Sequence, residues 1–216
     1  MTYFHVLVEG HADLPVVQEI LQRRFGLVAN KDFQVHPHRG KGKLPIYPNN
    51  PPAPQLQGLL DLLPAKLRAW VDLPAEHVVV VLVDADQDNC VELKARLVAM
   101  YEGLQKKAGT VLFRIAVEEA ESWLIADSQA VRTAYPRAKI QKIATLSPDS
   151  VVGAWECLAE AIGRKPRDCN PADKHEWAKI IMPHVNLDNP KSPSLRAFVD
   201  GIARFVGVAV LAGTNS

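Results

Sequence analysis

The segment from His77 to Val83 constrains the fold of this chain most. It reads His-Val-Val-Val-Val-Leu-Val, a run of mainly β-branched residues without polar alternation. A strand that is apolar on both sides has to be buried on both faces, which is typical of a central strand in a parallel sheet. Parallel neighbours are joined by crossover connections, usually helices. This single run therefore predicts an α/β fold.

The rest of the first half alternates between strand and helix patterns. Further strands are expected at Tyr3–Val8, Phe33–His36 and Thr110–Val117, and helices at 13–25, 56–71, 91–107 and 119–126. We expect Asp13 to cap the first helix and Pro64 to kink or break the second. The repeated order strand–helix predicts a mostly parallel four-stranded sheet with helices on its faces.

The second half is helical throughout. Helical patterns cover Ser128–Tyr135, Pro148–Ile162, Ala172–His184 and Ser194–Val206. We therefore expect an α/β core over residues 1–127 and a helical C-terminal extension over 128–216 packed on it. Charge divides at the same point: residues 1–127 carry 13 Lys and Arg against 16 Asp and Glu, and residues 128–216 carry 12 against 8. An acidic half is thus joined to a basic half.

The sequence also indicates where the protein works. The longest apolar run, Val78–Val83, is six residues, whereas a membrane helix needs about 20. The N-terminus has no basic stretch and reaches Glu9 too early for a signal peptide. The three cysteines form no Cys-x-x-Cys pair, as expected of free thiols in a reducing compartment. We expect a cytoplasmic protein without a membrane segment.

Acidic residues follow three of the predicted strands. Glu9 follows the first strand, Asp84 and Asp86 follow the central one, and Glu118, Glu119 and Glu121 follow the last. Ligands of open parallel sheets bind beyond these carboxyl ends. On an extended segment, Asp84 and Asp86 would point the same way, about 6–7 Å apart. Converging carboxylates repel unless a cation lies between them, and oxygen ligands suit Mg²⁺ or Mn²⁺.

These acids also have an ordinary structural interpretation. An Asp after a strand often caps a helix or forms a turn, and Asp88 is placed to cap the helix that begins near Val91. For any one acid alone the structural role is a real alternative. The combination of Glu9, Asp84 and Asp86 at adjacent strand ends favours a metal site.

The densest basic stretch runs from His36 to Lys43, in a loop over residues 37–55 that contains six prolines. Its cations would contact the phosphate backbone of a nucleic acid, and its glycines allow close approach. The predicted nucleic-acid contacts are His11, Arg39, Lys41 and Lys43. The alternative is a solvated loop. Lys174 is a candidate to stabilise charge during cleavage, or else an ordinary surface lysine.

Several stretches together resemble a known family. They are Val-Glu-Gly-His-Ala-Asp-Leu-Pro from Val8, Leu-Val-Asp-Ala-Asp-Gln-Asp from Leu82, Val-Glu-Glu-Ala-Glu-Ser-Trp from Val117, and Pro193-Ser194-Leu195. The glutamate after the first strand and the Asp-x-Asp after a later one resemble the Toprim domain of topoisomerases, primases and OLD-family nucleases. More specifically, the chain resembles the DUF4276 family of Toprim-like proteins, and the resemblance spans nearly its whole length.

The resemblance implies a Toprim-like, Rossmann-like core and a role for each matching position. Glu9 would be the Toprim glutamate, acting as general base or metal ligand, and Asp84 and Asp86 the metal-binding pair. Glu119 and Glu121 would be further metal ligands, with Glu121 nearer the ion. Two nearby residues are assigned structural roles: we expect Trp123 to lie in the core and Asp127 to cap the next helix.

The expected function is a nuclease that uses one or two Mg²⁺ or Mn²⁺ ions to cleave phosphodiester bonds. The resemblance further implies a bacterial defence setting and an AAA or ABC-type ATPase as a separate partner chain. One alternative is a non-catalytic module that binds such an ATPase and keeps a vestigial metal site. Another is a small-molecule phosphotransfer enzyme that uses the same acids.

Overall fold

The computed structural model describes residues 1–207. Within that range four strands form one sheet in the order β2-β1-β3-β4, and all three neighbouring pairs are parallel. The strands are β1 (Tyr3–Val8), β2 (Phe33–Pro37), β3 (His77–Asp84) and β4 (Val111–Ala116). The predicted fold class is confirmed: this is an α/β protein with a parallel sheet.

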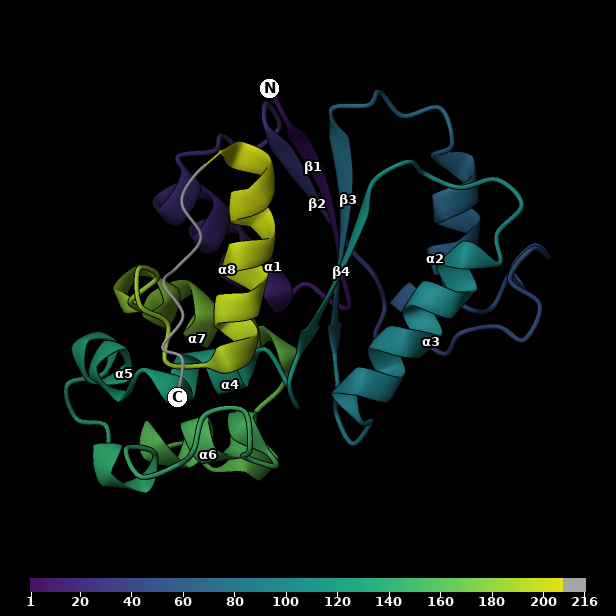
Figure 1. Cartoon of the computed structure of the whole chain (residues 1–216). Helices are drawn as coiled ribbons and strands as arrows, with labels where there is room; N and C mark the ends of the chain where they lie inside the picture. The colour runs from purple at the N-terminus through teal and green to yellow at the C-terminus, as the bar shows by residue number, and fades with distance from the viewer. Residues whose placement is uncertain (208–216) are drawn as a thin grey trace.

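Helices cover both faces of the sheet (Figure 1). They are α1 (Asp13–Glu19), α2 (Leu59–Ala69), α3 (Cys90–Glu102), α4 (Glu121–Ala126), α5 (Ser128–Ala134), α6 (Ala154–Ala161), α7 (Pro171–Ile181) and α8 (Pro193–Val206). A π-helical turn η1 (Ile20–Arg24) continues α1, and 3-10 turns lie at η2 (Ile140–Lys142), η3 (Pro166–Asp168) and η4 (Met182–His184). In Figure 1, α2 and α3 lie on one side of the sheet and α1 and α8 on the other.

The central strand β3 explains how the two layers are held together. Its alternate residues Val78, Val80 and Leu82 pack into the core under α1 and α8. The residues between them, Val79, Val81 and Val83, pack into a second core under α2 and α3. Both faces of β3 are therefore buried, as the unbroken apolar run predicted.

The helical second half shares its core with the sheet. The larger apolar cluster joins Phe4 and Val80 of the sheet to Leu158, Ile181 and Phe198 from the helices. The division at residue 127 stays a prediction, and residues 208–216 of the predicted extension lie outside the described residues. No helix within residues 1–207 is long and apolar enough to cross a membrane.

Three local expectations are wrong. Asp13 is the first residue of α1 and does not cap it, because the N-cap is Ala12 without a side-chain bond. Asp88 does not cap α3; the side chain of Asn89 does, accepting from two backbone N–H groups. Helix α2 continues through Pro64, so the helix is not broken there, because its leucines bury against the sheet and packing outweighs the missing hydrogen bond.

A row of three histidines crosses the sheet beneath α2. His5 Nδ1 lies 3.4 Å from His36 Nε2, and His5 Nε2 lies 3.0 Å from His77 Nδ1. The ring of Trp70 covers the row, with its centroid 4.9 Å from that of His5. Burial lowers the pKa of His5, and burial together with Lys66 lowers the pKa of His36 to about 4. The imidazoles of these two residues are therefore neutral near pH 7.

Candidate active site

The carboxyl ends of β1, β3 and β4 meet at one edge of the sheet, because these three strands are parallel neighbours (Figure 1). Glu9 follows β1 directly, and Asp84 is the last residue of β3. Glu9 Oε1 accepts a hydrogen bond of 2.8 Å from the backbone N–H of Asp84. The strand ends thus bring the Glu9 carboxylate to the last residue of β3, and the expected grouping of Glu9, Asp84 and Asp86 around an ion stays a prediction.

Both carboxylates are electrostatically unfavourable where they lie. Burial raises the pKa of Glu9 to about 8. The hydrogen bond from the Asp84 N–H opposes this shift, and the carboxylates of Asp13 and Asp86 add to it. Burial and the nearby carboxylates of Asp13 and Glu9 raise the pKa of Asp84 well above its usual range. Without a cation, these groups hold protons at pH values where exposed carboxyls are ionised.

Asp13 is a member of the site that sequence reasoning missed. Its carboxylate Oδ2 accepts from the backbone N–H of Gly10 at 2.9 Å. Burial, together with Glu121, raises the pKa of Asp13 to about 6. The sequence alone favours a helix cap, because an Asp at a helix start usually is one. The signal for its place in the site is its spacing of four residues from Glu9, across the strand-to-helix turn.

The segment after β4 and helix α7 supply further charged residues to the site. Lys174 Nζ lies 3.7 Å from Glu119 Oε2 and 3.5 Å from Glu121 Oε1, and 5.1 Å from the centre of the Trp155 ring. Burial alone would lower the pKa of Lys174, but the two glutamates outweigh it and raise that pKa. Burial and Glu121 raise the pKa of Glu119 to about 7.

We call Glu9, Asp13, Asp84, Glu119 and Glu121 the acidic cluster. Asp84 feels the charge of each of the other four, which shows that they share one place. Glu119 Oε2 is buried and makes no hydrogen bond. Lys174 forms ion pairs with two glutamates of this cluster, and its role in cleavage stays a prediction.

Asp86 lies apart from Asp84. The prediction that the two point the same way from an extended segment is wrong, because the chain turns after Asp84 and Asp86 has a left-handed φ of 49°. Its backbone N–H donates to the carbonyl of Glu118 at 2.8 Å, and its side chain is 51% exposed. Asp86 still lies close enough to Glu9 to raise that residue's pKa.

Lys41 holds this turn. Its Nζ lies 2.9 Å from carboxylate oxygens of both Asp86 and Asp88 and 3.0 Å from the carbonyl of Ala85. Asp88 also pairs with Arg96 at 2.7 Å. The ammonium of Lys41 is therefore bound within the protein, beside the acidic cluster.

The other predicted phosphate contacts are exposed. Arg39 and Lys43 lie on the loop after β2, and the backbone N–H of Gly40 between them donates to the carbonyl of Glu9 at 2.8 Å. This bond holds the basic loop against the acidic cluster. His11 is exposed, and its carbonyl accepts from His175 Nδ1 of α7 at 2.8 Å.

Three residues of the segment that follows β4 have structural roles. The carboxylate of Glu118 accepts from the N–H groups of Gly153 and Ala154 and so caps α6. Asp127 accepts from Ala130 N–H and caps α5, as predicted. Trp123 is fully buried, as predicted, and its indole N–H donates to Ser194 Oγ at 2.7 Å.

The acidic cluster fits a hard divalent cation by its chemistry. Carboxylate oxygens are the ligands that Mg²⁺ and Mn²⁺ prefer, and burial together with neighbouring carboxylates raises the pKa values of Glu9, Asp84 and Glu119. Over residues 1–207, however, no three His, Cys, Asp or Glu side chains are already arranged to hold an ion. The ligand types are present, and their side chains now point to Asp84 N–H, Gly10 N–H and Lys174.

No curated protein matches this chain. Three solved structures of the C-terminal region of the Xanthomonas campestris pv. campestris OLD protein are similar in structure. One has a TM-score of 0.49 at 12% identity and covers 95% of each chain. Another has a TM-score of 0.48 at 16% identity and covers 96% of this chain and 97% of the other.

Sequence comparison gives a firmer assignment. The profile of the family described as "Domain of unknown function (DUF4276)" matches residues 8–203. This range includes every residue of the acidic cluster and the loop that carries Arg39 and Lys43. Because the match spans most of the chain, this protein belongs to the DUF4276 family.

Proposed function

We propose that this protein is a nuclease of Toprim type that uses Mg²⁺ or Mn²⁺ to cleave phosphodiester bonds in nucleic acid. The observation that carries the proposal is the acidic cluster at the carboxyl edge of the parallel sheet, with a basic loop bonded to Glu9 beside it. A phosphate backbone needs cations to approach such a cluster, and the loop supplies them. The resemblance to Toprim domains supports the same assignment.

Each acidic residue has a proposed role that follows from its position in the site. Glu9, Asp84 and Asp86 are the proposed catalytic residues and would hold a divalent ion, for which the Asp86 carboxylate would have to leave Lys41. Glu119 and Glu121 are the proposed ligands of a second ion. When bound, such ions activate water and stabilise the leaving oxygen. Glu9 is also suited to take a proton, because its pKa of about 8 lies near neutral pH. The ammonium of Lys174 lies at the rim of the glutamates, where it can offset charge on a phosphate.

The proposal extends to the setting. We infer that the protein is cytoplasmic and acts in bacterial defence beside a separate AAA or ABC-type ATPase, as the resemblance implies. A non-catalytic binding module is the second candidate. It is favoured by the ion pairs of Lys41 with Asp86 and of Lys174 with Glu121, which already balance part of the negative charge.

A direct assay separates these functions. Purified protein is incubated with supercoiled DNA, linear DNA and tRNA, with Mg²⁺, with Mn²⁺ or with EDTA, and with or without a candidate AAA or ABC-type ATPase. We expect cleavage of at least one polymer that EDTA abolishes. Absence of cleavage in every combination would favour the binding module. Hydrolysis of free nucleotides alone would favour a small-molecule enzyme.

The basic loop makes a separate prediction about nucleic-acid binding. In the double variant Arg39→Ala with Lys43→Ala, the slope of log affinity against log salt concentration should fall by about two, because each lost phosphate contact removes about one unit. The measurement is fluorescence anisotropy with a labelled oligonucleotide at several salt concentrations. Lys31→Ala is the control, since Lys31 is an exposed lysine at the opposite end of β2. An unchanged slope in the double variant would exclude the loop from the interface.

A further inference from the structure

The side chain of Lys41 is placed differently from those of its basic neighbours Arg39 and Lys43. Those two residues are exposed on the basic loop, whereas the side chain of Lys41 is only 16% exposed. Its ammonium lies 2.9 Å from carboxylate oxygens of both Asp86 and Asp88, and 3.0 Å from a backbone carbonyl of the same turn. These three acceptors match the three N–H groups of the ammonium.

The backbone of the basic loop is fixed against the start of α2. The carbonyls of Gly40 and Lys41 accept from the first two N–H groups of that helix, at 2.8 and 2.7 Å. A Cβ at Gly42 would overlap the carboxylate of Asp61, so the loop approaches the helix as closely as only glycine allows. Because these contacts hold the backbone, a movement of the ammonium has to come from the flexible four-carbon stem of Lys41.

The carboxylate of Asp86 depends on Lys41 more than that of Asp88 does. Asp88 also pairs with Arg96 at 2.7 Å and keeps this partner without Lys41. Within residues 1–207, the side chain of Asp86 is bonded to Lys41 alone. This side chain is 51% exposed, so an ion from solvent can reach it. Lys41 is therefore the group that a cation has to displace in order to bind Asp86.

The charge of Lys41 also reaches the acidic cluster. Burial raises the pKa of Glu9 to about 8, the carboxylate of Asp86 adds to this rise, and the charge of Lys41 opposes it. The pair of Lys41 and Asp86 thus lies within electrostatic reach of the glutamate that the proposed function assigns to the metal. An ammonium and a divalent ion on the same carboxylate would repel each other strongly, because only a few ångström would separate them.

We propose that Lys41 is an internal counter-ion of the cation site, whose ammonium leaves Asp86 when a divalent ion binds there and then contacts a phosphate of the nucleic acid. This inference rests on the proposed function, because it requires an ion at Asp86. The released ammonium would join Arg39 and Lys43 on the same loop, so binding of the ion and binding of nucleic acid should favour each other. The alternative is a purely structural role, in which Lys41 holds the turn after β3 whether or not an ion is bound.

Calorimetric titration with Mg²⁺, without nucleic acid, separates the two roles by the sign of the effect. Lys41→Met keeps the stem and removes the ammonium. If the ammonium competes for Asp86, the dissociation constant for Mg²⁺ should fall about fivefold, the factor that corresponds to one ion pair near a protein surface. If it only holds the turn, the constant should stay the same or rise. Lys43→Met is the control, because it removes the same charge from an exposed side chain of the same loop. It should change the constant far less.

The position of the ammonium can be followed in the wild-type protein by nuclear magnetic resonance of ¹⁵N-labelled lysine. An ammonium with three acceptors exchanges its protons slowly and gives its own signal, and Lys41→Met identifies the signal of Lys41. Saturating Mg²⁺ should remove this signal or move it to the position of exposed lysines. Lys107 is the matched control, because its ammonium also has three acceptors, in Tyr101 and Glu102, ahead of β4 at the amino ends of the strands. Its signal should not change.

The phosphate contact is tested with a phosphorothioate oligonucleotide, which resists cleavage. In saturating Mg²⁺, Lys41→Met should lower the slope of log affinity against log salt concentration by about one, and in EDTA it should leave the slope unchanged. An equal slope in Mg²⁺, a Lys41 signal that persists in Mg²⁺, or an equal or weaker Mg²⁺ affinity in Lys41→Met would each overturn the counter-ion role. The proposed function would still stand in these cases, provided that the wild type binds Mg²⁺. If neither the wild type nor Lys41→Met binds Mg²⁺, both proposals fail.

Discussion

Replacing Asp84 by Asn is expected to lower metal-dependent cleavage on the order of 10²–10³-fold, the loss seen when a preorganised electrostatic group is removed from an active site. Asp84 lies at the centre of the acidic cluster, where it feels the charge of Glu9, Asp13, Glu119 and Glu121. The amide keeps the size of the side chain but removes the negative charge that would bind a cation. Cleavage rates with saturating Mg²⁺ and Mn²⁺ measure the effect.

Stability measurements distinguish a lost site from a lost fold. Because folding raises the pKa of Asp84, the neutral amide should leave the metal-free protein as stable as the wild type, or more stable, at pH about 8. Asp72→Asn is the matched control, since Asp72 is exposed before β3 at the opposite end of the sheet. Full activity in the Asp84 variant would refute its catalytic role, and a large fall in melting temperature would leave folding as the cause.

The sequence predicted the sheet because its signal is local. The apolar run from His77 to Val83 predicts a buried strand by itself, without knowledge of the segments that pair with it. In the structure this strand is buried on both faces. The meeting of Glu9 with Asp84 followed from topology alone, because parallel strands end at the same edge. Element types were therefore predictable, while several helix ends differ by a few residues because caps and packing set them.

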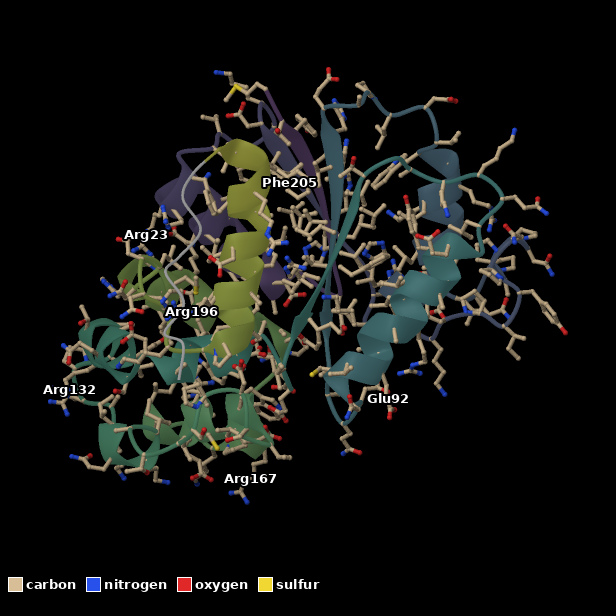
Figure 2. The ribbon with its side chains drawn as sticks, in the orientation of Figure 1. Arg23, Glu92, Arg132, Arg167, Arg196 and Phe205 are labelled. Carbon is tan, nitrogen blue, oxygen red and sulfur yellow. The ribbon has the colours of Figure 1, made fainter. Side chains whose placement is uncertain are left out.

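The missed parts of the site depend on contacts between distant segments. Asp86 leaves the extended conformation because its N–H bonds to Glu118 and its carboxylate to Lys41, neither of which is visible from Asp-x-Asp spacing. Lys174 comes from the basic half of the chain to meet glutamates of the acidic half. The charge division in the sequence thus has a structural counterpart at this ion pair. Much of the remaining basic surface is solvated, as Arg132 and Arg167 show at the periphery of Figure 2.

Stability of the metal-free protein should fall as pH rises from about 6.5 to about 8. Folding raises the pKa of Glu9 from 4.5 to about 8 and that of Glu119 from 4.5 to about 7. In this range the folded chain holds protons that the unfolded chain has released. The contribution of these two carboxyl groups to the free energy of unfolding is fully present below pH 4.5 and is lost as pH rises through the folded pKa values. Each group contributes at most about 1.4 kcal/mol per pH unit.

The histidines act in the opposite direction at the lower end of this range. Burial lowers the pKa values of His5, His36 and His38 from 6.5, so the stability that depends on these groups falls on acidification. Because an unfolded imidazole is still half protonated at pH about 6.5, this contribution levels off only at pH about 7.5. The slope between pH about 7.5 and about 8 therefore reports the carboxylates.

Mg²⁺ should restore the stability that is lost as pH rises, because a cation that binds the ionised acidic cluster binds the folded chain and not the unfolded one. At a concentration one hundred times its dissociation constant, Mg²⁺ would add about 2.7 kcal/mol to the free energy of unfolding. Urea unfolding in EDTA and in Mg²⁺ at the two pH values gives both quantities. Glu9→Gln should flatten the pH slope and weaken the Mg²⁺ effect, while Asp72→Asn should change neither. A wild type whose stability stays level or rises over this range, or does not respond to Mg²⁺, would show that the acidic cluster is balanced within the chain and is not a cation site.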